Sequence, residues 1–255
     1  MYINMSVLIK NNSVRILKDV INRSDILLEV IDIRMPRDTR IYELEKYITK
    51  KGKAIILVLN KADLVPEDFA ETVREEFQSE FPTVYVSSKT RKGTRVLRNL
   101  IKEYSPEKQK IYVGLFGYPN TGKSSIINVL VGRRRARTAP IPGFTKGIQI
   151  VKLSSKHYLV DTPGIYYPKD INLLAILGVV RPEKLEYPEK VVEYLIEKLP
   201  KIFIRESYKI DFADLEDLLR KISDIYKIKG KDWRRRSAIK ILNDWIKGKI
   251  KGYWF

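Results

Sequence analysis

The sequence contains no cysteine among its 255 residues. The chain on its own therefore cannot form a disulfide, build a zinc knuckle or use a thiol in catalysis, while its redox compartment stays undetermined. Histidine is almost as scarce: His157 is the single one, and it stands at the start of a predicted strand, where we expect a structural role. We accordingly expect no disulfide and no zinc.

Long apolar runs are also missing. No stretch approaches the roughly 20 consecutive apolar residues that cross a bilayer. The opening MYINMSVLIKNN lacks the charged-then-apolar order of a secretion signal. We therefore expect a cytoplasmic protein with no membrane partner.

Basic residues, by contrast, are abundant. The chain has 49 Lys and Arg against 31 Asp and Glu, a net charge of +18, so a polyanion such as nucleic acid is a natural partner. Three stretches hold this excess, namely residues 91–110, 133–147 and 227–255. A solvated helix face explains the first as well as RNA does, and cations at a helix end explain Arg133 to Arg135. The last stretch interleaves aromatic and basic residues, which favours RNA.

Short apolar runs typical of strands alternate with helical patterns through the first 160 residues. The pattern predicts strands at residues 26–32, 54–60, 83–88, 111–117, 148–153 and 157–161. Such alternation predicts an α/β fold with a doubly wound, mostly parallel six-stranded sheet. The last two strands are separated by a few residues only and should form an antiparallel hairpin.

The helical pattern alone continues after DTPGIYYP, with helices predicted at residues 189–198, 211–226 and 232–245. We therefore expect a nucleotide-binding domain over residues 1–168 and a small, basic, all-α domain over residues 169–255 that binds RNA.

The stretch GYPNTGKSS matches a phosphate-binding loop, G-x-x-x-x-G-K-[ST], between a predicted strand and a predicted helix. In this motif the glycines let backbone N–H groups face phosphate oxygens, Lys123 reaches the β- and γ-phosphates, and the Ser124 hydroxyl binds Mg²⁺. The predicted phosphate contacts are Asn120, Thr121, Gly122, Lys123, Ser124 and Ser125.

The stretch NKAD follows the predicted strand 54–60 and indicates a guanine-reading loop. The Asp63 carboxylate can accept hydrogen bonds from N1–H and the amino group of guanine, which adenine does not offer, so we expect adenine to be rejected. Asn60 should tie this loop to the phosphate loop, and the Lys61 stem should cover the base. The next loop holds Ser87, Ser88 and Lys89, whose backbone we expect at the guanine carbonyl.

Two further positions complete the predicted GTP site. Asp161, in DTPG, should hold Mg²⁺ through water, and the Gly164 N–H should contact the γ-phosphate. Thr145, in PGFTKG, is the candidate second hydroxyl for Mg²⁺.

The order of these motifs is rotated. A Ras-like GTPase begins with the phosphate loop and ends with the guanine-reading loops, whereas here NKAD and SSK precede GYPNTGKSS and DTPG. Joining the old termini and opening the chain after DTPG leaves the same sheet, because chain ends lie on the surface and tolerate permutation. We therefore predict a circularly permuted GTPase domain whose Gly164 leads directly into the helical domain, so nucleotide state can move that domain.

The rotated order, DIRMP at Asp32 to Pro36, PGFTKGIQ and the C-terminal AIKILNDWIKGKIKG together resemble the YlqF/YawG family, the ribosome biogenesis GTPase A-like proteins. The resemblance implies help in large-subunit assembly, a C-terminal domain that binds rRNA, and GTP-controlled residence on a pre-ribosome. Two features depart from the family: Ile33 replaces an Ala, and the opening Trp-Phe-Pro-Gly-His-Met of bacterial members, with its histidine, is missing.

Hydrolysis must proceed without the water-orienting Gln that Ras-type enzymes carry after D-x-x-G, because Ile165 stands there. The family resemblance implies that Asn120 binds K⁺ beside the phosphates. We expect slow intrinsic turnover, faster with K⁺ and with the ribosomal partner, with Lys123, Thr145, Gly164 and Asn120 as the catalytic residues.

Three alternatives stay open. In the first, the protein is an RNA-binding placeholder in which GTP sets conformation and hydrolysis is minor. The second is the permuted small-subunit GTPase family, whose OB-fold and Cys/His zinc module are not seen in this sequence. The third, a phosphotransferase kinase, leaves NKAD and DTPG without a role. The sequence does not determine the oligomeric state or the RNA helix.

Overall fold

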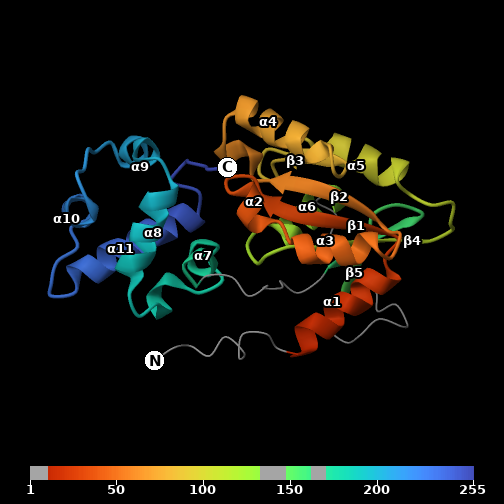
Figure 1. The fold of residues 1–255 in the computed structure, drawn as a ribbon, viewed down its shortest axis with the longest axis horizontal. Coiled ribbons are helices and arrows are strands. Elements are labelled where there is room, and N and C mark those ends of the chain that lie inside the picture. Colours follow the sequence, from red (N-terminus) through yellow and green to blue (C-terminus); the bar gives the residue numbers. More distant parts are fainter. Residues whose placement is uncertain (1–10, 133–147, 162–170) are drawn as a thin grey trace. The chain divides into compact units, whose positions relative to one another are not determined.

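The computed structural model describes residues 11–132, 148–161 and 171–255. The chain divides into two compact units, Met1–Pro168 and Lys169–Phe255, and each is described by itself (Figure 1). Thr145, Gly164, Ile165 and the arginines that begin at Arg133 lie outside the described residues.

The first unit is built on a six-stranded sheet with the strand order β3-β2-β1-β4-β6-β5. The strands are β1 (Ile26–Asp32), β2 (Ala54–Asn60), β3 (Thr83–Val86), β4 (Ile111–Phe116), β5 (Gln149–Lys152) and β6 (His157–Asp161). Neighbouring strands are parallel except for the pair of β5 and β6. The predicted α/β fold with a mostly parallel sheet is therefore confirmed.

The strand bounds follow the apolar runs closely. Strands β1, β2 and β6 begin and end as predicted, and β5 pairs antiparallel with β6, with Gln149 opposite Asp161. Strand β5 is one residue shorter than predicted at each end, and β3 and β4 end earlier than predicted because the chain turns away into loops at Ser87 and Gly117. Both of these residues belong to the candidate site.

Helices cover both faces of the sheet. In the first unit the structure describes α1 (Asn11–Arg23), α2 (Pro36–Thr39), α3 (Tyr42–Thr49), η2 (Ala62–Leu64), α4 (Glu67–Gln78), α5 (Thr94–Glu103) and α6 (Lys123–Val131). Leu97 of α5 and Ile126 of α6 pack with Leu28 into the main core on one face. On the other face Val20 of α1 packs against Val160. These layers hold the parallel strands in register.

The carboxyl ends of the parallel strands meet at one edge of the sheet. Ligands bind at this edge in open α/β sheets, because loops leave the strands there in opposite directions. The polar residues at the ends of β1, β2 and β6 are Asp32, Asn60 and Asp161, and the loop after β4 begins at Gly117. The fold thus gathers the sequence motifs at a single edge.

The second unit is described as helices only: α7 (Ile171–Ile176), η3 (Pro182–Lys184), α8 (Pro188–Lys198), α9 (Lys201–Tyr208), α10 (Leu215–Ile225) and α11 (Trp233–Ile246). Helices α7 and α9 lie outside the predicted helices; Pro200, between two predicted helices, is the residue that precedes α9. Helix α10 begins four residues later than predicted because the Asp214 side chain caps it, accepting a hydrogen bond from the Asp217 N–H at 2.9 Å. Trp245 is fully buried.

Candidate functional site

The phosphate-loop motif forms the turn between β4 and α6. Its backbone has positive φ at Gly117 (143°), Asn120 (63°) and Gly122 (101°), a conformation that glycine adopts freely and Asn tolerates better than most residues. A Cβ at Gly122 would lie 2.1 Å from the Asn60 Nδ2 atom, so only glycine fits beside that side chain. The sequence therefore places the loop backbone directly at the start of helix α6, where N–H groups point outward.

Lys123 is the first residue of α6 and is buried. Its Nζ atom donates to the carbonyl oxygens of Gly117 at 2.9 Å and Tyr118 at 2.8 Å. Burial lowers the pKa of Lys123 to about 8, against the opposing effect of the negative Asp161. At pH 7 the side chain is mostly a cation, held inside the loop that would wrap a phosphate.

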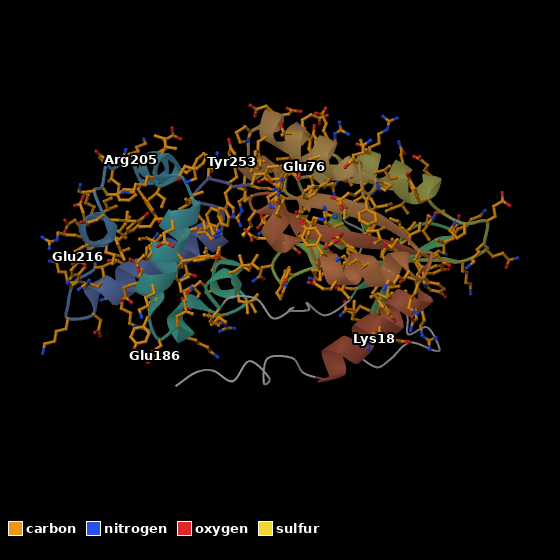
Figure 2. The ribbon with its side chains drawn as sticks, viewed as in Figure 1. Lys18, Glu76, Glu186, Arg205, Glu216 and Tyr253 are labelled. Atoms are coloured by element: carbon orange, nitrogen blue, oxygen red, sulfur yellow. The ribbon has the colours of Figure 1, made fainter. Side chains whose placement is uncertain are left out.

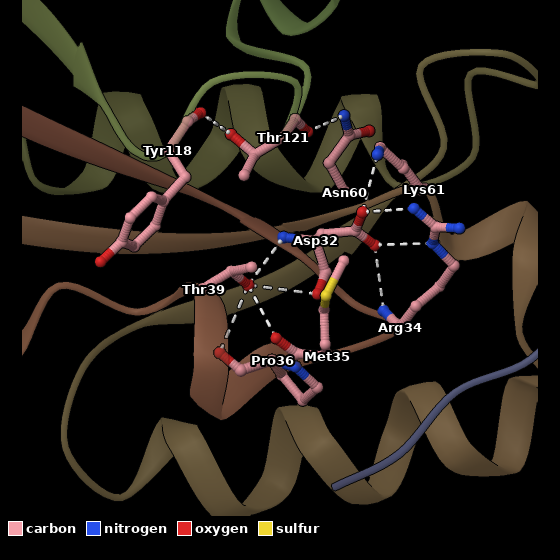
Figure 3. Close-up of polar contacts among 9 residues, drawn as sticks. All are labelled: Asp32, Arg34, Met35, Pro36, Thr39, Asn60, Lys61, Tyr118 and Thr121. Carbon is pink, nitrogen blue, oxygen red and sulfur yellow. Dashed lines mark hydrogen bonds and ion pairs between the residues drawn. The ribbon is translucent and has the colours of Figure 1, made fainter. Parts of the chain in front are cut away.

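Asn60, at the end of β2, connects three loops. Its Nδ2 atom donates to the Thr121 carbonyl oxygen of the phosphate loop at 2.8 Å (Figure 3). Its Oδ1 atom accepts from the Ser88 N–H at 3.4 Å. The side chain thereby fixes the guanine-reading loop to the phosphate loop on one side and to the loop after β3 on the other, as the sequence predicted for the phosphate loop.

Asp63 is oriented by the loop after β3. The Ser87 hydroxyl donates to the Asp63 Oδ1 atom at 2.6 Å, and the same hydroxyl accepts from the Thr90 N–H at 3.0 Å. Asp63 is half-buried in the short turn η2. One carboxylate oxygen is therefore fixed by a neighbour, and the carboxylate group can accept from paired donors such as the guanine edge.

The end of β1 contributes a group that the sequence analysis did not assign to the site. Asp32 is 1% exposed, and its carboxylate pairs with Arg34 and with Lys61 of the guanine-reading loop, Nζ to Oδ2 at 2.6 Å. We call Asp32, Arg34 and Lys61 the Asp32 clamp. The sequence places Asp32 at the end of a predicted strand, and the folded sheet shows that this strand is the neighbour of β2, so that both strands end at one edge.

Charges shift the proton equilibria of the Asp32 clamp. Burial alone would raise the pKa of Asp32, but the nearby charges of Arg34 and Lys61 outweigh burial and hold the pKa well below its usual range. Burial lowers the pKa of Lys61, while the Asp32 carboxylate opposes this. The carboxylate of Asp32 is therefore ionised at every physiological pH.

The residues at the β4–β6 edge suit a magnesium nucleotide. Ser124 is exposed in the first turn of α6, and Asp161 ends β6, the strand beside β4. Asp161 also acts electrostatically on Lys123, so the two side chains share one region. Within the described residues no group of three or more His, Cys, Asp or Glu side chains could hold a metal alone. The fit is to Mg²⁺ that takes most of its ligands from phosphate and water.

The other predicted site residues differ in their surroundings. Ser125 and Lys89 are exposed, on α6 and in the loop after β3. Thr145 and Gly164 lie outside the described residues, so their predicted roles stay predictions. His157 has hydroxyl partners on both ring nitrogens, Ser105 at Nε2 and Ser154 at Nδ1, each at 2.8 Å.

The arginine triplet of the basic C-terminal stretch is engaged within its own unit. Arg234 pairs with Glu216 at 2.6 Å, and Arg235 donates to the carbonyl oxygens of Glu183 and Glu186 at 3.0 Å; Figure 2 marks Glu186 and Glu216. Lysines in the same stretch, Lys227, Lys229 and Lys231, are exposed and form no ion pair with any residue of the described part. No helix in the described ranges is long and apolar enough to cross a membrane.

Comparisons with known proteins agree with this arrangement. The family model described as "RsgA GTPase" matches residues 4–169, and the model described as "50S ribosome-binding GTPase" matches residues 112–227. A GTP-binding protein of Methanocaldococcus jannaschii is 41% identical over 94% of this chain. Nucleolar GTP-binding protein 2 of Yarrowia lipolytica is 38% identical over 92% of it.

The chain spans 66% of the length of the first relative and 49% of the second. Among solved structures, GDP-bound TM YlqF matches with a TM-score of 0.66 and 23% identity, covering 94% of this chain and 97% of that chain, which is a likeness of fold. The eukaryotic relative is named nucleolar, so the cytoplasmic location stays a prediction for this chain. From the family model, the order of its motifs and the fold, the chain belongs to the RsgA GTPase family and is a circularly permuted GTPase.

Proposed function

We propose that the protein is a GTP-binding and GTP-hydrolysing switch in assembly of the large ribosomal subunit. It binds rRNA through basic surfaces, and nucleotide state is coupled to the C-terminal unit. The observation that carries this proposal is the side chain of Asn60, which joins the phosphate loop at Thr121 to the loop after β3 at Ser88. A guanine-reading loop and a phosphate loop fixed to each other form one nucleotide site.

The guanine base is read by Asp63, whose orientation by Ser87 supports this role. Asp63 accepts from the N1–H and amino group of guanine, and adenine leaves the half-buried carboxylate without these two donors. The Lys61 stem covers the base, and the backbone around Ser88 and Lys89 contacts the guanine carbonyl.

The phosphates are bound by the backbone of the phosphate loop and the first turn of α6, from Asn120 to Ser125. Lys123 supplies positive charge to the β- and γ-phosphates. Ser124, Asp161 and Thr145 hold Mg²⁺, which neutralises charge on the phosphates, and the Gly164 N–H reads the γ-phosphate. The location of Asp161 near Lys123 supports this assignment.

Hydrolysis in this proposal is slow and stimulated by K⁺ and by the ribosomal partner. Asn120 holds its side chain at an exposed, left-handed position of the phosphate loop, which suits a K⁺ ligand beside the phosphates. We expect faster single-turnover hydrolysis in K⁺ than in Na⁺, and loss of the difference in Asn120→Ala. Equal rates in the two salts would contradict the role of the ion, and hydrolysis that stays negligible with ribosomal subunits would favour the placeholder alternative.

The ribosomal part of the proposal rests on the family model described as "50S ribosome-binding GTPase" and on the names of the relatives. The exposed lysines of residues 227–231 are the natural RNA contacts, since the neighbouring arginines have partners within the unit. Replacing Lys227, Lys229 and Lys231 by Gln should weaken RNA binding and flatten its dependence on salt. Matched replacement of the arginines should also lower the melting temperature.

Co-sedimentation with purified large and small ribosomal subunits tests the proposal. The protein should sediment with the large subunit in a non-hydrolysable GTP analogue and be released with GDP, at low and at moderate salt. Retention on neither subunit in either nucleotide would contradict the ribosomal role and leave a GTPase with another partner. Retention on the small subunit alone would favour the permuted small-subunit GTPase family.

A further inference from the structure

The DIRMP stretch at the end of β1 has no contact role in the proposed function. It lies between the two loops that do, because β1 pairs with β2 on one side and with β4 on the other. The Ile33 N–H donates to the Asn60 carbonyl oxygen at 3.0 Å, so the stretch also touches the guanine-reading loop through its backbone.

Contacts with Thr39 and Arg34 hold Asp32 in place independently of Lys61. Its N–H donates to the Thr39 hydroxyl at 3.1 Å, and its Oδ1 atom accepts from the N–H of Arg34 at 3.2 Å (Figure 3). The Arg34 guanidinium adds two bonds to the same carboxylate, Nε to Oδ1 at 3.0 Å and Nη2 to Oδ2 at 2.8 Å. Two-point contact of this kind fixes the plane of the carboxylate as well as its position.

Lys61 is the residue on which this fixed carboxylate acts. Its backbone has φ 66°, a left-handed conformation that is unfavourable for a residue with a side chain and persists where other contacts hold it. The bond from Nζ to Asp32 Oδ2 is 2.6 Å long, and the side chain is 21% exposed. The left-handed turn at Lys61 redirects the chain after Asn60 so that Asp63 follows in the short turn η2.

We propose that Asp32 and Arg34 are positioning residues for guanine recognition: they hold Lys61, and through its left-handed turn they aim Asp63 at the base. This inference rests on the proposed function. Arg34 orients Asp32, Asp32 holds Lys61, and neither Asp32 nor Arg34 contacts the nucleotide. Loss of the carboxylate should therefore weaken the part of binding that depends on the base and spare the part that depends on the phosphates.

The test compares two probes on the full-length chain by calorimetry: GDP, which uses both loops, and inorganic tripolyphosphate, which uses the phosphate loop alone. Asp32→Asn keeps the shape of the side chain and removes its charge. We expect it to weaken GDP about tenfold or more and to leave tripolyphosphate affinity unchanged. Glu45→Gln is the matched control, because it also neutralises a buried carboxylate paired with an arginine, and it should change neither affinity.

A double-mutant cycle separates positioning from a general structural role. If Asp32 acts through Lys61, Asp32→Asn should have little further effect on GDP affinity in a Lys61→Met background. Additive effects would overturn the proposal. So would unchanged GDP affinity in Asp32→Asn, or equal losses for GDP and tripolyphosphate.

Asp32→Asn removes the charge that Arg34 and Lys61 share, so the variant can fail to fold. In that case Asp32→Asn/Arg34→Met, which also removes the more buried cation, is measured instead. The expected affinities for GDP and tripolyphosphate are the same. ADP binding to the unaltered chain is the check on the proposed function. If ADP binds the unaltered chain as tightly as GDP does, guanine recognition itself is absent and the positioning role is excluded with it. If the unaltered chain prefers GDP to ADP and Asp32→Asn does not, the positioning role is supported.

Discussion

Strand β1 and the segment after it contribute to two buried clusters of charge with different surroundings. The Asp32 clamp ends at Lys61, in the guanine-reading loop. The second, which we call the Arg40 cluster, consists of Glu29, Arg40, Glu45 and Glu80; Arg40 is 1% exposed and pairs with Glu45 at 2.6 Å and Glu80 at 3.0 Å. It connects β1 to helix α3 and to the end of α4, and Arg40 lies over the ring of Phe77 at 4.5 Å.

The difference is in what each cluster fixes. Both bury an arginine with carboxylates, an arrangement that contributes little net stability but is costly to break on one side. The Arg40 cluster fixes packed helices, so breaking it should change stability and spare nucleotide binding. The Asp32 clamp fixes a loop whose backbone is left-handed at Lys61, so breaking it should change binding. Similar ion pairs can thus stabilise either the scaffold or the site. The outcome depends on whether the paired residue lies in a packed helix, as Glu45 does, or in a binding loop, as Lys61 does.

Loss of the cation in the Arg40 cluster should reduce stability strongly. Arg40→Met leaves the buried carboxylate of Glu45 without its cation and should lower the free energy of unfolding by about 3–5 kcal/mol, measured by denaturant unfolding. Arg37→Met, which removes an exposed pair with Glu76, should cost no more than about 1 kcal/mol. A weaker GDP affinity in the folded Arg40→Met variant would contradict the expectation that the Arg40 cluster affects stability and not nucleotide binding.

Two glycines with positive φ distinguish a role in the nucleotide site from a role in the backbone alone. Gly122→Ala places a Cβ 2.1 Å from Asn60 Nδ2 and should separate the guanine-reading loop from the phosphate loop, weakening GDP about a hundredfold. Gly132→Ala is the matched control: its φ is also positive, at 82°, but no described atom lies within 4 Å of the added Cβ. Both variants should lose some stability, and equal GDP affinities in a titration would contradict the role of Asn60.

Proton linkage at Lys123 gives a smaller effect on binding. The pKa of Lys123 in the protein without nucleotide is about 8, below its usual value because of burial. Negative phosphates should raise it again, so binding takes up a proton and weakens as pH rises through 8. We expect GDP affinity to fall about fivefold from pH 8 to pH 9, beyond the change seen in Lys123→Met. Parallel pH profiles of the two proteins would contradict this.

The smallest effect concerns stability in the Arg40 cluster. Burial, reinforced by Glu45, raises the pKa of Glu29, so the folded state binds a proton more tightly than the unfolded state and stability falls as pH rises above about 4.5. Glu29→Gln keeps an oxygen for the Ile41 N–H and cannot ionise. Relative to the unaltered chain, its free energy of unfolding should rise between pH 5 and pH 7, as measured by urea unfolding. If the difference in free energy of unfolding between the two proteins were constant from pH 5 to pH 7, Glu29 would not be the group that binds the proton.

Much of this arrangement follows from the sequence, because the strands and the nucleotide motifs are encoded in short, contiguous stretches of residues. Strand runs such as 26–32 and 54–60 are continuous and apolar, so period and length fix them, and NKAD and GYPNTGKSS carry their chemistry within a few residues. Helix α9 is not evident from the sequence because a proline such as Pro200 either ends a helix or precedes a new one, and here it precedes α9. The link between Asp32 and Lys61 was missed because it depends on which strands are neighbours, a property of the folded sheet.

In the proposed site Asp63 reads guanine at the carboxyl edge of the sheet, and a change of base isolates this contact. Asp63→Asn keeps an oxygen for the Ser87 hydroxyl and turns one acceptor into a donor, which suits xanthine, where a carbonyl replaces the guanine amino group. The affinities of the unaltered chain and the variant for GDP and xanthosine diphosphate should be measured side by side. We predict that the unaltered chain prefers GDP and the variant prefers xanthosine diphosphate; a variant that keeps the preference for GDP would exclude Asp63 as the residue that reads the base.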